Sequence, residues 1–157
     1  MFKTRFIGLI GLAAMVSVSP AALAAESPVT LDSTVKLEKL ITEGGKTRHE
    51  LVEPQKVVPG NKLVFRTTYR NTGAKPVNQF VVTNPLPSAV VLADDAGGFE
   101  SSVDGGKSWG KLAALKVADG KGGLRAAQTD DVTHVRWVLS VIAPGATGTL
   151  EYHAVVR

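Results

Sequence analysis

The fold class is decided by residues 63–73, which read Leu-Val-Phe-Arg-Thr-Thr-Tyr-Arg-Asn-Thr-Gly. In this stretch the odd-numbered side chains Leu63, Phe65 and Tyr69 alternate with the even-numbered Arg66 and Arg70. A period of two predicts a β-strand that buries one face and exposes the other. The closing Asn-Thr-Gly predicts a turn, because these residues adopt tight backbone conformations at low cost.

Other segments show the same kind of pattern on both sides of this strand. Residues 35–41 and 47–52 flank Glu43-Gly44-Gly45-Lys46 and predict a β-hairpin. Residues 77–83 are β-branched and aromatic and predict the next strand, which Asn84-Pro85-Leu86-Pro87 ends because proline cannot donate to a ladder. Residues 90–92 form a short apolar continuation.

The end of the chain predicts a second hairpin, with Pro144-Gly145 as its turn. Apolar residues alternate along residues 135–141 and again along residues 150–156. In that register Trp137 faces Tyr152 and Leu139 faces Leu150, so apolar pairs stack on one side. Because the sequence ends at Arg157, we expect the last strand to be an uncovered edge that binds a protein partner or a second copy.

Residues 93–131 differ from the rest of the chain because they hold eight of the sixteen glycines. Glycine adds no side-chain packing, so this stretch predicts loops and short hairpins, with one possible turn of helix around residues 111–115. Six to eight short strands without a βαβ rhythm favour an all-β fold. We expect an antiparallel β-sandwich, preceded by a cleaved signal peptide.

The first 24 residues have the three-part layout of a secretory signal. Lys3 and Arg5 are positive, an apolar stretch follows over residues 6–18, and Ala22-Leu23-Ala24 offers small residues to a signal peptidase. We predict cleavage after Ala24, with Ala25 as the alternative, and therefore an exported protein that is periplasmic, secreted or bound at the cell surface. Residues 25–56 then supply an N-terminal hairpin, and residues 57–157 form the sandwich with 93–131 as an insertion.

Composition narrows the function classes. The chain carries a net charge of +4, and without Lys3 and Arg5 its 16 basic residues face 14 acidic ones, a balance of +2 spread over the whole chain. That distribution does not predict nucleic-acid binding. No cysteine is present, which excludes disulfides and thiolate sites, and no later segment has the apolar length of a membrane span.

Three groups of residues carry a family resemblance: residues 58–73 from Val-Pro-Gly to Asn-Thr-Gly, residues 81–87 ending in Asn-Pro-Leu-Pro, and Trp137 with Ala143-Pro144-Gly145. Together they resemble the bacterial conserved-repeat domain of unknown function (DUF eleven), over about residues 57–156. The resemblance implies an exported immunoglobulin-like module of bacterial surface proteins, with no activity assigned. This chain has one copy rather than a tandem array, and residues 93–131 lengthen the usual spacing.

A short motif stands inside the glycine-rich stretch. Residues 102–109, Ser-Val-Asp-Gly-Gly-Lys-Ser-Trp, are similar to the Asp-box of sialidase-like propellers, in which the aspartate binds the hairpin backbone. A propeller needs one copy per blade, and this chain has one. The motif therefore predicts a tight Asp-Gly-Gly hairpin, with Trp109 as a local core residue.

The sequence offers candidate residues for two metal sites and for one class of catalysis. Calcium prefers several carboxylate oxygens, and the candidate ligands are Asp94, Asp95, Asp104, Asp130 and Asp131. His134 and His153 fall on one polar face of the expected terminal hairpin, yet Arg136 lies between them and no further ligand completes a site. Ser108 has a Gly-x-Ser-x-Gly spacing with Gly106 and Gly110, but it falls inside the predicted Asp-Gly-Gly hairpin and not at a strand-to-helix elbow, so we do not expect an enzyme.

The most favoured function is a non-enzymatic structural or protein-interaction module of the bacterial cell envelope, which needs no cofactor. The alternative is a periplasmic protein that binds calcium or a small ligand through residues 93–131. Calcium bound only to the folded state would raise the melting temperature, which distinguishes the two.

Overall fold

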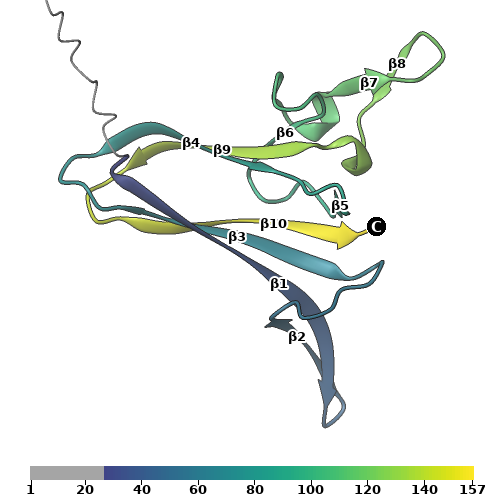
Figure 1. The fold of residues 1–157 in the computed structure, drawn as a ribbon, viewed down its shortest axis with the longest axis horizontal. Helices are drawn as coiled ribbons and strands as arrows, with labels where there is room; N and C mark the ends of the chain where they lie inside the picture. The colour runs from purple at the N-terminus through teal and green to yellow at the C-terminus, as the bar shows by residue number, and fades with distance from the viewer. Residues whose placement is uncertain (1–26) are drawn as a thin grey trace, which may run out of the picture.

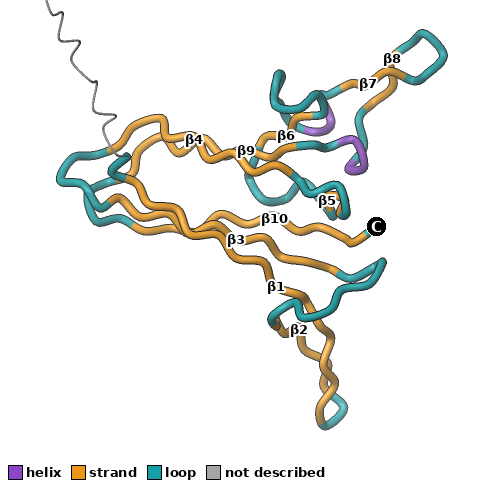
Figure 2. Tube along the Cα trace, viewed as in Figure 1, coloured by secondary structure: helices purple, strands orange, loops and turns teal. Residues whose placement is uncertain are grey.

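The computed structural model describes residues 27–157, so the predicted signal peptide and its cleavage sites at Ala24 and Ala25 lie outside the described residues. Ten strands and two short 3-10 helices make up the regular structure of this range (Figures 1 and 2). In chain order they are β1 (Val29–Glu43), β2 (Lys46–Val52), β3 (Lys62–Asn71), β4 (Val77–Pro85), β5 (Val90–Leu92), β6 (Glu100–Ser102), η1 (Leu112–Ala114), β7 (Lys116–Ala118), β8 (Leu124–Ala126), η2 (Thr129–Asp131), β9 (His134–Ile142) and β10 (Thr147–Val156).

The strands form three antiparallel sheets. One has five strands in the order β2-β1-β3-β10-β5, one has three in the order β4-β9-β6, and β7 pairs with β8 as a separate hairpin. The two larger sheets face each other and diverge towards one end (Figure 1). The all-β, antiparallel fold class expected from the period of two is therefore confirmed. No helix within residues 27–157 is long and apolar enough to cross a membrane.

The predicted hairpin around Gly44 and Gly45 is confirmed. Both glycines have positive φ angles, 57° and 77°, which a two-residue turn of this kind requires, and Glu43 pairs with Lys46 across it. β3 pairs with β1 only as far as Glu38, so the remainder of β1 has β2 as its neighbour. Consequently the β1–β2 hairpin projects beyond the two-sheet body as a narrow ribbon (Figure 1).

Aromatic side chains connect the two sheets. Phe65 of β3 stacks on Tyr152 of β10 with ring centroids 4.7 Å apart, and Tyr152 meets Trp137 of the other sheet at 6.3 Å. Trp137 in turn packs edge-on against Phe99 at 5.6 Å and donates its Nε1–H to the carbonyl of Gly97. The core is therefore continuous from one layer to the other.

The predicted terminal hairpin is wrong. β9 pairs with β4 and β6, whereas β10 pairs with β3 and β5, so the two strands belong to different sheets. The connection at Pro144-Gly145 crosses from one layer to the other instead of closing a ladder. Trp137 and Tyr152 still meet, but across the core, and His134 and His153 consequently lie in different sheets.

The expectation that the last strand is an uncovered edge is also wrong. β10 has β3 on one side, and β5 covers the other side from Ala154 to Val156. Beyond β5, the N–H of Ala93 donates to the carbonyl of His153. Arg157 is fixed as well, since its backbone N–H donates to the carbonyl of Ala89.

The buried face of β9 changes sides near its end. Val135 and Trp137 are buried as expected, yet Val141 is 62% exposed and Ile142 takes its place in the interior. The cause lies on the neighbouring strand, where Gln79 of β4 has a φ of 50° in the left-handed region. β4 and β9 keep the same register on either side of Gln79, so where β4 turns over at this kink the paired part of β9 turns over with it.

The glycine-rich stretch 93–131 contains more order than loops alone. Its first strand, β6, joins the three-stranded sheet beside β9, and β7 and β8 form the separate hairpin seen at one end of Figure 1. The helical turn expected around residues 111–115 is confirmed as η1.

A single buried side chain, Asn71, holds the two sheets together where the chain crosses between them. Its Nδ2 donates to the carbonyls of Ile142 and Lys75, each at 2.9 Å, and its Oδ1 accepts the N–H of Gly73. Its backbone N–H and C=O pair with Ala146 and Gly145. The predicted Asn-Thr-Gly turn is therefore the anchor of both crossings, β3 to β4 and β9 to β10.

We expect Asn71→Ala to lower the free energy of unfolding by about 2–3 kcal/mol, because it leaves the buried carbonyl of Ile142 and its other two partners unsatisfied. Asn78→Ala, at an exposed position of β4, is the matched control and changes the stability by less than about 0.5 kcal/mol. Urea unfolding of both variants measures the difference. Equal, small losses would contradict the anchoring role of Asn71.

Candidate functional site

The Asp-box-like motif folds as the tight hairpin that its sequence predicts. Ser101 and Gly110 pair as its base, and Gly105 and Gly106 have positive φ angles of 77° and 86°. The Asp104 carboxylate closes the loop by accepting hydrogen bonds from the hydroxyl of Ser108 at 2.6 Å, the hydroxyl of Ser102 at 2.7 Å and two backbone N–H groups. Asp104 is therefore engaged in holding its own hairpin.

These hydrogen bonds favour the ionised carboxylate. The side chain and the backbone N–H of Ser108 contribute most, followed by the Ser102 hydroxyl, and together they lower the pKa of Asp104 well below its ordinary value. The hydroxyls of Ser102 and Ser108 both donate to Asp104, so neither hydroxyl is free to donate its proton to a catalytic base.

Trp109 was expected in a local core, and the structure instead places it half-buried on the outer face of the three-stranded sheet. The Arg136 guanidinium lies 4.6 Å from the centre of its ring, and the Arg136 Nε–H donates to Glu100 at 2.8 Å. The His134 ring approaches Trp109 edge-on at 6.3 Å. This group, called the Trp109 cluster below, fixes the hairpin to β6 and β9 by a cation–π contact and an ion pair.

An apolar pair lies on the same outer face as the Trp109 cluster. Val81 of β4 and Val138 of β9 are partners in register, and they are 47% and 45% exposed. Two pairs further along, and therefore on the same face, Thr83 stands opposite Arg136. The outer face of β4 and β9 thus combines exposed aliphatic side chains with a fixed cation, a combination suited to contact with another protein surface.

The five candidate calcium ligands are not brought together. Asp94 accepts the N–H of Ala96 in its own turn, and Asp95 beside it is exposed. Asp131 binds Arg125 through two hydrogen bonds of 2.6 and 2.7 Å, and Arg125, followed by the N–H of Gln128, lowers the pKa of Asp131. The backbone carbonyl of Asp130 accepts a hydrogen bond from the Arg157 guanidinium. Within residues 27–157, no group of three or more histidine, aspartate or glutamate side chains could hold a metal ion.

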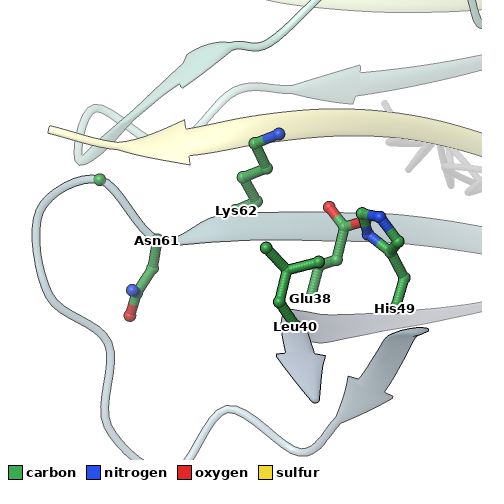
Figure 3. Close-up of a pocket in the computed structure, with 6 residues that line it drawn as sticks. Glu38, Leu40, His49, Asn61 and Lys62 are labelled. Atoms are coloured by element: carbon green, nitrogen blue, oxygen red, sulfur yellow. The ribbon is translucent and has the colours of Figure 1, made fainter. Parts of the chain in front are cut away.

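A shallow groove lies where the β1–β2 ribbon meets the start of β3 (Figure 3). Its walls are Glu38, Leu40 and His49 from the ribbon, Gly60 and Asn61 from the turn before β3, and Lys62 at the start of β3. The His49 ring contacts the Glu38 carboxylate, while Leu40 is 66% exposed beside them. At about 230 Å³ and open to solvent, the groove is smaller than the roughly 300 Å³ at which small-molecule pockets begin.

Sequence reasoning found the Asp104 hairpin but missed the Trp109 cluster and the groove. Trp109 and Arg136 are far apart in the chain, and only the pairing of β6 with β9 brings them together. The contact between Glu38 and His49 could have been predicted from the sequence. The Gly44-Gly45 turn fixes the ribbon register and sets Leu40 opposite His49, and Glu38 is two residues from Leu40 on the same face of β1.

A scan against protein-family models, a search of curated proteins and a search of solved structures each found no match to this chain. The resemblance to the conserved-repeat domain therefore stays a prediction from the residues that carry it.

We expect Asp104→Asn to flatten the acid dependence of stability. Because the pKa of Asp104 is lowered in the folded state, its contribution is complete above the ordinary carboxyl pKa of about 4 and is lost as the pH falls below it. Urea unfolding at neutral pH and at pH values below 4 measures this dependence. The variant should be less stable than the wild type at neutral pH, and the gap should narrow in acid. A gap of constant size would contradict the assignment.

Proposed function

We propose that this chain is a non-enzymatic structural or protein-interaction module of the bacterial cell envelope, exported to the periplasm or the cell surface. The observation that carries the proposal is the presence of long strand edges that still have free backbone groups. Among the described residues, β4 pairs only with β9, β2 pairs only with β1, and the first half of β1 pairs only with β3. Such edges can accept a strand from another protein.

The edge at β4 has side chains that suit a protein contact. Val81 lies on this strand, with Val138 beside it and Arg136 two residues from Val138 on the same face of β9. A partner strand added to β4 would bring its own side chains onto the same outer face, so backbone hydrogen bonds and apolar contact would act together.

The immunoglobulin-like character and the export of the chain are parts of the same proposal. Two facing antiparallel sheets with crossings between the layers support the first, and the charged, apolar and small-residue segments of residues 1–24 support the second.

Export predicts that the protein isolated from the envelope fraction begins at Ala25, or at Glu26 if the alternative site is used. Mass spectrometry of the intact protein and its N-terminal peptide measures this directly. If cleavage follows Ala24, Ala24→Lys should cause the precursor to accumulate, because a signal peptidase requires a small residue before the cut, whereas Ala24→Gly should be processed; if cleavage follows Ala25, Ala25→Lys should have that effect instead. A cytoplasmic protein that retains residues 1–24 would exclude export.

Partner binding at β4 predicts site-specific crosslinks in intact cells. A photoreactive phenylalanine analogue at Val81 should give discrete crosslinked products, because Val81 lies on the free edge strand. The same analogue at Leu124, an even more exposed apolar residue on the β7–β8 hairpin, is the control and should give none. Identical products from both positions, or none from Val81, would contradict an interaction surface at β4.

A further inference from the structure

The β2 edge differs from the β4 edge in ways that point to a particular partner. β4 ends at Pro85, which has no N–H, and Gln79 kinks it, so a strand added to β4 can pair regularly only along residues 80–84. β2 runs from Lys46 to Val52 without proline, glycine or a positive φ angle. It is therefore the more regular edge, and it lies on a ribbon whose side chains are mostly exposed.

The charges along β2 are complementary to themselves. Arg48 and Glu50 stand on one face of the strand, separated by His49 on the other face. In the single chain they form an exposed ion pair of 3.2 Å along the same strand, which leaves both side chains accessible to a neighbour. A strand that carries Arg48 and Glu50 in the reverse order would place each charge opposite its counterpart, and an antiparallel second copy presents that order.

Symmetry restricts the possible registers. Two copies that pair side by side and antiparallel are related by a two-fold axis perpendicular to the sheet, so residues on the same face pair and the axis passes midway between the two copies of one residue. Centring the axis on Arg48 pairs Lys46 with Glu50 twice but sets two arginines against each other, and centring it on Glu50 sets two glutamates against each other; each of these registers pairs only five residues of β2. Centring it on His49 pairs Arg48 with Glu50 twice and uses all seven residues of β2.

We propose that a second copy of this chain docks antiparallel along β2, with His49 opposite His49 of the second copy and Arg48 opposite its Glu50. The inference rests on the proposed function as an interaction module and names one partner for it. Thr47 of each copy then lies next to Leu51 of the other, which covers a leucine that is 40% exposed in the single chain. The outcome is one continuous sheet through both ribbons.

The pairing covers Leu51 but not the other exposed leucine of the ribbon. Leu40 pairs with His49 in register and is 66% exposed, and in the dimer both β2 strands separate it from its symmetry mate. One strand pair of seven residues buries less than the about 1,200 Å² typical of stable complexes. The dimer is therefore expected to form in a concentration-dependent manner and to exchange.

Cysteine trapping tests the register directly, because the chain has no cysteine of its own. His49→Cys sets two thiols opposite each other at a separation that a disulfide can span, so mild oxidation should yield a covalent dimer. Thr47→Cys is the matched control: alone it faces Leu51 and should remain monomeric, whereas a mixture of Thr47→Cys and Leu51→Cys should crosslink. Equal crosslinking of His49→Cys and Thr47→Cys would overturn the proposed register.

Charge exchange tests the interaction without a covalent bond. Sedimentation of the protein isolated from exporting cells should show a dimer at high concentration, and Arg48→Glu should weaken it about tenfold because two unlike pairs become like pairs. The double variant Arg48→Glu with Glu50→Arg restores both pairs and should restore the dimer. Lys121→Glu makes the same charge change on an exposed turn away from β2 and should have no effect. An unchanged Arg48→Glu dimer, or no dimer for the wild type, overturns the proposal.

Failure here is distinct from failure of the proposed function. If the protein stays monomeric while Val81 still forms crosslinks in cells, the second copy is excluded as a partner and the interaction module stands. If an analogue placed at His49 crosslinks only to a different protein, β2 is an interaction edge but the proposed partner is wrong. A far-UV circular dichroism spectrum that matches the wild type shows, for each variant, that the dimer is lost while the fold is retained.

Discussion

The side-chain amide of Asn71 is the constraint on which the rest of the arrangement depends. It lies fully buried at the end of the molecule where both layer-crossing connections meet, and it is bonded to Ile142, Lys75 and Gly73. A buried amide with all its partners satisfied specifies one arrangement, because any other leaves polar groups unpaired. Once the two crossings are fixed at this end, the sheets must face each other and can diverge only at the opposite end (Figure 1).

That constraint accounts for the aromatic core and for the position of the last strand. With β9 and β10 held in opposite layers, Trp137 and Tyr152 meet across the interior instead of side by side on one sheet. β10 then lies between β3 and β5, so the end of the chain is enclosed in a sheet. Among the described residues, the long free edges are consequently at β4, at the first half of β1 and on the projecting ribbon, whereas β5, β7 and β8 offer edges of only three residues.

Local features could be predicted from the sequence, and long-range pairing could not. The Gly44-Gly45 hairpin and the Asp104 hairpin follow from turn residues within a few positions of each other. The alternation in β9 and β10 correctly identified Trp137 and Tyr152 as inward-facing. The alternation does not show whether the two apolar faces lie side by side on one sheet or meet across a core, because both arrangements bury the same residues. The kink at Gln79 has no sequence signal, since glutamine rarely adopts a positive φ angle.

Charge on the β2 edge acts in two ways at once. A free edge that carried only Lys46 and Arg48 would repel any second copy, which is how many sheet proteins prevent aggregation. The addition of Glu50 makes the repulsion selective, because the registers centred on Arg48 and on Glu50 each set two like charges against each other, whereas the register centred on His49 sets only unlike charges opposite each other. The same three side chains therefore favour one register of strand addition over its neighbours, and the edge is exposed without a proline or a bulge to protect it.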